Sequence, residues 1–139
     1  MTPLLRATLA LAHGLWVWHT AQVLGAPHGV EHLRDFCQQQ GITEVYVSFA
    51  PDVDLAPLVT ALHGAHVRVE ALLSSTNADE AGPHREKLLD KVRAVMQFNA
   101  RHPDTRFDGI HLDIEPQQRP ENKGPGNLAY LPGLIDAYR

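Results

Sequence analysis

Strand-like and helix-like segments alternate four times along this chain, and that alternation constrains its fold more than any other feature. The strand-like segments are residues 14–20, 43–50, 65–75 and 106–116, and the helix-like segments are 29–41, 54–64, 83–103 and 128–139. Strands that alternate with helices are typical of a parallel sheet with right-handed crossovers. The sequence therefore predicts an α/β domain built from four βα units.

Local signals support the expected helices. Gly41 ends the first one, where a helix C-terminus favours a residue with positive φ. The helix over 83–103 has the clearest apolar stripe, and the residues of this stripe that we expect in the core are Leu88, Leu89, Val92, Val95 and Met96. Asn127 directly precedes the last helix and is its expected N-cap.

Two architectures fit this order of elements. A complete (β/α)8 barrel takes about 250 residues, or roughly 31 for each unit, so a chain of 139 residues supplies about half of one. We expect residues 1–139 to form a single partial domain, the N-terminal half of a TIM barrel, with a polar loop at 116–127 after the fourth strand. An open doubly wound parallel sheet is the alternative, although no G-x-G-x-x-G or Walker A sequence supports nucleotide binding there.

Composition narrows the expected partners. The net charge is -4 and the basic residues are scattered, which gives no footprint for nucleic acid or for an anionic membrane. No apolar run is long enough to span a bilayer, and the short apolar stretch after Arg6 favours a lead-in to the first strand over a secretion signal. The single cysteine, Cys37, assigns no compartment.

The stretch FDGIHLDIEP at 107–116 carries ionisable groups at every second position of an otherwise apolar strand. Successive side chains of a strand point to opposite faces, so one face should pack under the helices: Ile110, Leu112 and Ile114. The opposite face should carry His111, Asp113 and Glu115. In a barrel that face lines the lumen, and Glu115 would lie nearest the C-terminal mouth, where barrel enzymes keep their active sites.

Asp113 and Glu115 are candidates for acid/base chemistry. They lie about 6.6 Å apart along the strand, and two carboxylates that close together disfavour each other's ionisation. One of them should therefore have a raised pKa, which suits a general acid near neutral pH. Glu115 is the better-placed acid because Pro116 ends the strand directly after it. Asp113 is the candidate for its orienting partner.

Other residues of the same face would support this pair. Glu70 on the third strand can reach the lumen and pair with His111 or Arg68, and Tyr46 shares the inner face of the second strand. Trp18 would offer a platform for a sugar ring if its face is the lumen. Core packing is the other interpretation of this tryptophan, and the sequence does not decide which face of the first strand it occupies.

The segment DGIHLDIE resembles the D-x-x-D-x-D-x-E signature on the fourth strand of the chitinase-like family 18 glycoside hydrolases, within the TIM-barrel glycoside hydrolases. The resemblance implies that Glu115 protonates the glycosidic oxygen, while Asp113 helps to hold a substrate acetamido group that acts as the nucleophile. His111 stands in place of an aspartate of the signature, and the third strand lacks S-x-G-G, which argues against an N-acetylated substrate. Together with GLWVW near the start, the strand is also similar to uncharacterised bacterial barrel proteins of this kind.

The function that the sequence favours is a glycoside hydrolase-like protein, which cleaves or binds a carbohydrate at the barrel mouth by acid/base catalysis. One alternative is a metal-dependent barrel hydrolase of the phosphodiesterase kind, with His111, Asp113 and Glu70 as candidate ligands. Another is a non-catalytic fragment or interaction module. No cofactor and no metal are expected for the favoured function, and the half barrel alone is not expected to be fully active. Its bare sheet edges predict self-association or a missing C-terminal half.

Overall fold

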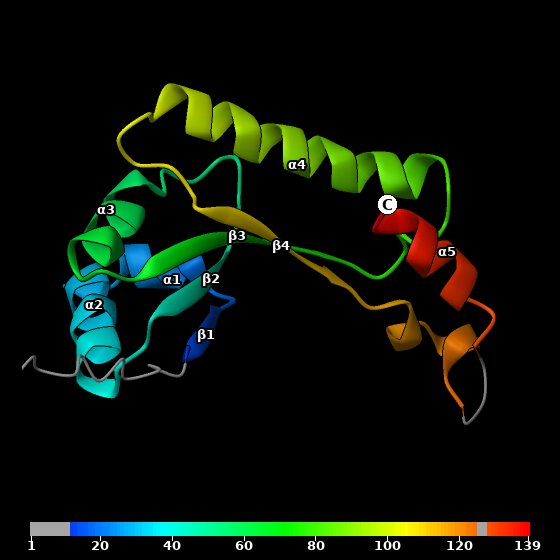
Figure 1. The fold of residues 1–139 in the computed structure, drawn as a ribbon, viewed down its shortest axis with the longest axis horizontal. Helices are drawn as coiled ribbons and strands as arrows, with labels where there is room; N and C mark the ends of the chain where they lie inside the picture. Colours follow the sequence, from blue (N-terminus) through cyan, green and yellow to red (C-terminus); the bar gives the residue numbers. More distant parts are fainter. Residues whose placement is uncertain (1–11, 125–127) are drawn as a thin grey trace, which may run out of the picture.

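The computed structural model describes residues 12–124 and 128–139, and its centre is a sheet of four parallel strands (Figure 1). The strands are β1 (Gly14–Val17), β2 (Glu44–Ser48), β3 (Arg68–Ser75) and β4 (Gly109–Ile114). They lie side by side in chain order, β1-β2-β3-β4. The predicted α/β fold of four parallel strands in βα units is confirmed. The lead-in expected before the first strand lies outside the described residues.

The helices follow the expected order with two differences. They are α1 (Thr20–Gly25), α2 (Gly29–Gln40), α3 (Ala56–Gly64), α4 (Pro83–Arg101) and α5 (Leu131–Ala137). The sequence did not predict α1, and α5 begins later than expected, after Tyr130 as its N-cap. Asn127 lies outside the described residues, and it is not the cap of α5. Gly41 ends α2 with φ 64°, as predicted.

The strand order decides how the helices are arranged. A doubly wound sheet reverses its strand order at a switch point, and this sheet does not. Crossovers of one hand between strands in simple succession place all the helices on the same face. The sheet is therefore open, as the alternative architecture predicted, but it is singly wound and not doubly wound.

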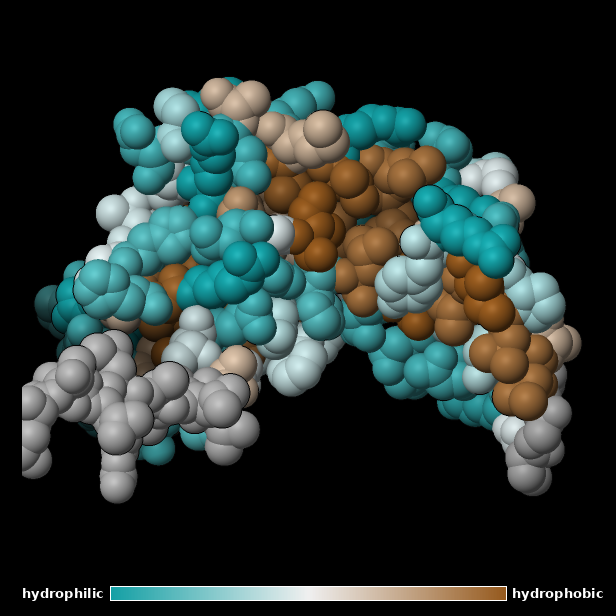
Figure 2. All heavy atoms as spheres, viewed as in Figure 1, coloured by the Kyte–Doolittle hydropathy of each residue, from teal (hydrophilic) through white to brown (hydrophobic). Residues whose placement is uncertain are grey.

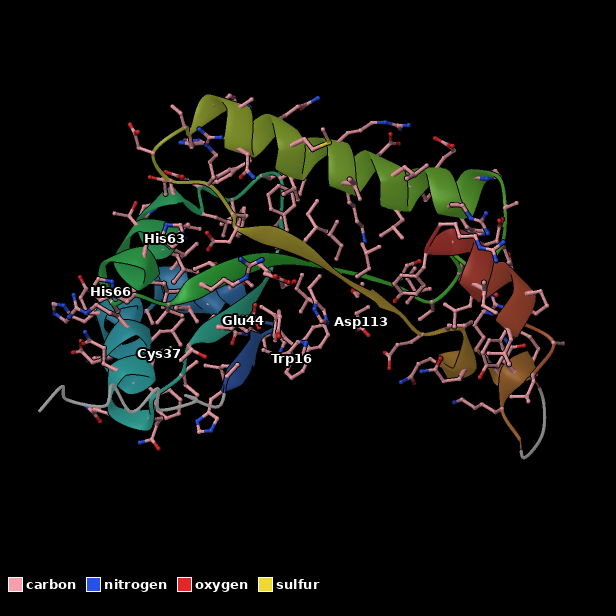
Figure 3. All side chains as sticks on the ribbon, viewed as in Figure 1. Trp16, Cys37, Glu44, His63, His66 and Asp113 are labelled. Carbon is pink, nitrogen blue, oxygen red and sulfur yellow. The ribbon has the colours of Figure 1, made fainter. Side chains whose placement is uncertain are left out.

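The hydrophobic core lies between that face and the helices. Its buried side chains are Val17, Val45, Val47, Val69, Ala71, Leu73 and Ile114 from the strands, and those from the helices include Leu58, Leu62, Val95 and Phe98. The other face of the sheet carries no helix among the described residues. Figure 3 places Trp16, Glu44 and Asp113 on that open face, away from α4. Figure 2 shows that the molecule is arched, with a hollow beneath the sheet.

The apolar stripe predicted for α4 is only partly covered. Leu88 and Val95 are buried, but Leu89 is 38% exposed and Met96 is 63% exposed. The prediction that all five residues of the stripe pack in the core was therefore wrong for these two. Brown apolar surface between α4 and β4 is visible in Figure 2, beside the edge strand of the sheet. The apolar stripe of α4 is therefore wider than the part of the helix that packs against the sheet.

Candidate functional site

The alternation expected in β4 places its two sets of side chains on opposite faces. Ile114 is buried in the core, and Ile110 and Leu112 pack partly buried against it. On the open face the His111 ring contacts Tyr46 of β2, and Asp113 lies two residues further towards the carboxyl end. The expected separation of an apolar and an ionisable face is present.

A pocket of about 370 Å³ opens where β1, β3 and β4 end. It is lined by Trp18, Ser74, Ser75, Thr76, Asp113 and Glu115, and we call it the acidic pocket. Trp18 directly follows β1 and is 48% exposed, so it is a wall of this pocket and not part of the core. The structure thus brings together three residues that the sequence selected from strands one and four: Trp18, Asp113 and Glu115.

Asp113 is the carboxyl of this pocket whose pKa is raised. Partial burial is the main cause, the nearby Glu115 carboxylate adds to it, and His111 opposes it. The sequence predicted that one of the two carboxyls would hold its proton more tightly than usual. The structure gives that property to Asp113, whereas the sequence had assigned the role of proton donor to Glu115.

Glu115 lies at the junction between β4 and the loop that follows. Its backbone N–H donates to the Ser75 carbonyl at 2.9 Å, which extends the pairing of β3 and β4 by one step. The amides of Gln117 and Gln118 reach its Oε1 at 3.4 and 3.5 Å. Hydrogen bonds of this length are weak, so the carboxylate is held loosely beside the pocket.

An aromatic cluster lies deeper on the open face. Tyr46 is centred 4.8 Å from the Trp16 ring and 4.3 Å from the His111 ring. The register explains the first of these contacts, because Trp16 pairs with Tyr46 across β1 and β2. Trp16 was not among the predicted site residues. It is 47% exposed, so this ring is also available for contacts.

Charged groups surround the aromatic cluster. Arg68 binds Glu70 at 2.8 Å and Glu44 at 3.0 Å, and the Glu70 carboxylate also lies 3.8 Å from the His111 Nδ1. The Tyr46 hydroxyl donates to Glu44 at 2.7 Å, and this bond is the main cause of the raised pKa of Tyr46. Both partners suggested for Glu70 are therefore present. Glu44 was missed, and only the strand register could have identified it.

Asp108, the first residue of the signature-like segment, lies at the opposite end of β4 from the acidic pocket. Its Oδ2 accepts the Val69 N–H at 2.7 Å and lies 2.9 Å from the His63 Nε2. It therefore ties the start of β4 to β3 and to α3. This position gives Asp108 a structural role and no contact with the pocket.

A buried ion pair fixes the loop beyond Glu115. Within the loop predicted at 116–127, the structure has two short 3-10 turns, Pro116–Gln118 and Pro120–Asn122. Arg119 between them binds Asp79 at 2.8 Å, with side-chain exposures of 11% and 4%. This pair joins the loops after β3 and β4, which border the acidic pocket. Sequence periodicity gave no signal for it, because the two residues are far apart in the chain.

Among the described residues, no group of three or more His, Cys, Asp or Glu side chains could hold a metal ion. In the same part of the chain, no helix combines the length and the apolar character that a membrane crossing requires.

Comparison with known proteins gives no match to any family model, any curated protein or any solved structure.

Proposed function

We propose that this protein is a carbohydrate-active, glycoside hydrolase-like protein whose site is the acidic pocket. The main support for the proposal is the meeting of Trp18, Asp113 and Glu115 around one pocket at the carboxyl ends of parallel strands. Enzymes built from successive βα units use this end of the sheet for catalysis. An exposed indole next to two carboxyl groups provides a stacking surface for a sugar and an acid/base pair.

The two carboxyl groups take different roles in the proposal. Glu115 in its acid form donates a proton to the glycosidic oxygen as the bond to the sugar carbon breaks. Its carboxylate then accepts a proton from a water molecule whose oxygen bonds to that carbon, which restores the acid form and releases the sugar. Asp113, with its raised pKa, holds its proton to a higher pH than an ordinary aspartate, which limits the repulsion between two close negative charges. His111 precedes the pair on the same face of β4. Its ring packs against Tyr46 and lies beside the Glu70 carboxylate, which holds it in place next to Asp113.

We also propose that the open sheet is the first half of a (β/α)8 barrel. The singly wound order supports this, as do the exposed apolar residues of α4, Leu89 and Met96. Further βα units, from a C-terminal half or from a second copy, would cover this surface and supply the remaining walls of the site. The half barrel by itself would then bind carbohydrate more readily than it cleaves it.

The experiment that tests the proposed activity is a glycosidase assay of the protein and of Glu115→Gln on a panel of oligosaccharides. A general acid accounts for about a hundredfold of the rate or more, so kcat should fall at least that far while the fold stays intact. Glu31→Gln is the matched control, because Glu31 is exposed on α2 away from the pocket. Full turnover in Glu115→Gln would contradict the assignment.

A chelator separates this proposal from metal-dependent hydrolysis. Acid/base cleavage by Glu115 needs no ion, so activity should survive chelation. Loss of activity that a divalent ion restores would favour the phosphodiesterase kind of chemistry instead.

A further inference from the structure

A second pocket, of about 400 Å³, adjoins the acidic pocket. We call it the basic pocket, because the α4 residues that line it include His84, Lys87 and Lys91. Its opposite wall is the end of β3, and the residues common to both pockets are Ser74, Ser75 and Thr76. Three residues at the end of a strand span roughly 7 Å. The two pockets are therefore close enough for neighbouring units of one glycan to enter both.

The basic pocket concentrates positive charge on one face of α4. His84, Lys87 and Lys91 follow one another at spacings of three and four residues, which places them on the same side of a helix. The Lys91 Nζ donates to the Ser74 carbonyl at 3.0 Å, so this ammonium group is fixed at the wall that the two pockets share.

Little negative charge opposes these groups. The His84 ring lies 3.7 Å from a Glu80 carboxylate oxygen, which is a long contact. Neither Lys87 nor Lys91 forms an ion pair with another described residue. The two ammonium groups therefore face the pocket without a carboxylate partner in the described part of a chain whose net charge is -4.

We propose that the basic pocket is a subsite for an anionic substituent of the glycan, a carboxylate or a sulfate ester. This inference rests on the proposed function, and it narrows the substrate class to acidic carbohydrates. Lys87 and Lys91 would bind the anion, and the Ser75 hydroxyl, which accepts the Asn77 N–H, is a further donor on the wall. Carboxylates in the acidic pocket repel an anion, so the two pockets together would also fix the orientation of the chain of sugars.

The test measures binding of three probes by calorimetry: a galacturonic acid trisaccharide, a sulfated galactose oligosaccharide and neutral maltotriose. We expect the acidic probes to bind more tightly than the neutral one, and the preference to weaken at high salt. Lys87→Gln and Lys91→Gln should each weaken binding of the acidic probes by about tenfold. This is the lower end of the effect expected when one hydrogen bond to a charged group is lost. The carboxylate and sulfate probes together identify which substituent is preferred.

Lys123→Gln is the matched control, since it removes the same charge from a lysine that lines neither pocket. Equal binding of neutral and acidic probes, with no effect of either lysine variant, would overturn the anionic subsite and leave the proposed function intact. Binding of no saccharide at all would overturn the proposed function and the subsite with it. If Lys87→Gln, Lys91→Gln and Lys123→Gln all weaken binding of the acidic probes equally, the effect comes from the overall charge of the protein. That result would also overturn the subsite.

Discussion

Asp113 is less easily ionised in the folded chain than in the unfolded chain, because burial and the Glu115 carboxylate raise its pKa. A carboxyl group whose pKa is raised by folding contributes stability that is complete below the ordinary aspartate pKa. That contribution is lost as the pH rises through the raised pKa. Above the raised pKa, the ionised Asp113 therefore reduces the stability of the fold relative to a neutral side chain.

Asp113→Asn should accordingly increase the free energy of unfolding at neutral pH, since the amide has nearly the same shape and cannot ionise. The gain should shrink as the pH falls below the ordinary aspartate range, where the wild-type carboxyl is protonated in both states. Urea denaturation at several pH values measures this difference. Asp104→Asn, at an exposed turn position, serves as the control. A gain that does not depend on pH would contradict the burial argument.

The residues of β4 illustrate what could be predicted from sequence and what could not. Alternation was enough to separate Ile114 from Asp113, because a strand has only two faces. It could not place Trp18, since the face of β1 depends on the register with β2. It also could not identify which carboxyl has the raised pKa, because that depends on burial in three dimensions.

Among the secondary-structure elements, the positions of the strands and of the long helices followed from periodicity, which is a local property. The short α1 has too few residues to show a clear period, and the start of α5 depends on the loop before it. The covered part of α4 depends on neighbours in the sheet, so the sequence overestimated its buried stripe at Leu89 and Met96.

The loop after β4 contains Arg119, whose ion pair with Asp79 is almost completely buried, whereas its other partners, Glu80 and Glu121, are exposed. Arg119→Ala leaves the Asp79 charge buried without its partner, and breaking a buried pair in this way costs about 3 kcal/mol or more. We expect a loss of that order in the free energy of unfolding, measured by urea denaturation. Arg93→Ala, which removes an exposed arginine from α4, should cause no measurable change. A loss no larger than that of the control would show that the pair does not stabilise the loop.

At the scale of the whole molecule, the described part of the sheet ends in two edge strands, β1 and β4, and exposed edge strands favour association. The exposed Leu89 and Met96 add apolar surface on α4. We expect the protein to self-associate through this surface when no further βα units cover it. Met96→Lys should reduce association in sedimentation experiments without lowering stability, because the side chain is already exposed.

Gln39→Lys is the control for this comparison, because it adds the same positive charge at an exposed position of α2. It should leave association unchanged if the apolar surface on α4 is the one that makes the contact. A chain that sediments as a monomer with and without the Met96 substitution would weaken the half-barrel proposal.

Carbohydrate binding in the acidic pocket can be tested directly with the two tryptophans of the chain. Trp18 lines the pocket, whereas Trp16 lies deeper on the same face in the aromatic cluster. Their two indole N–H resonances can be followed by NMR during titration with oligosaccharides. We expect a saturable shift of the Trp18 resonance that exceeds the shift of Trp16 and is weakened by Glu115→Gln. Indole resonances that stay in place throughout the titration would contradict carbohydrate binding at this pocket.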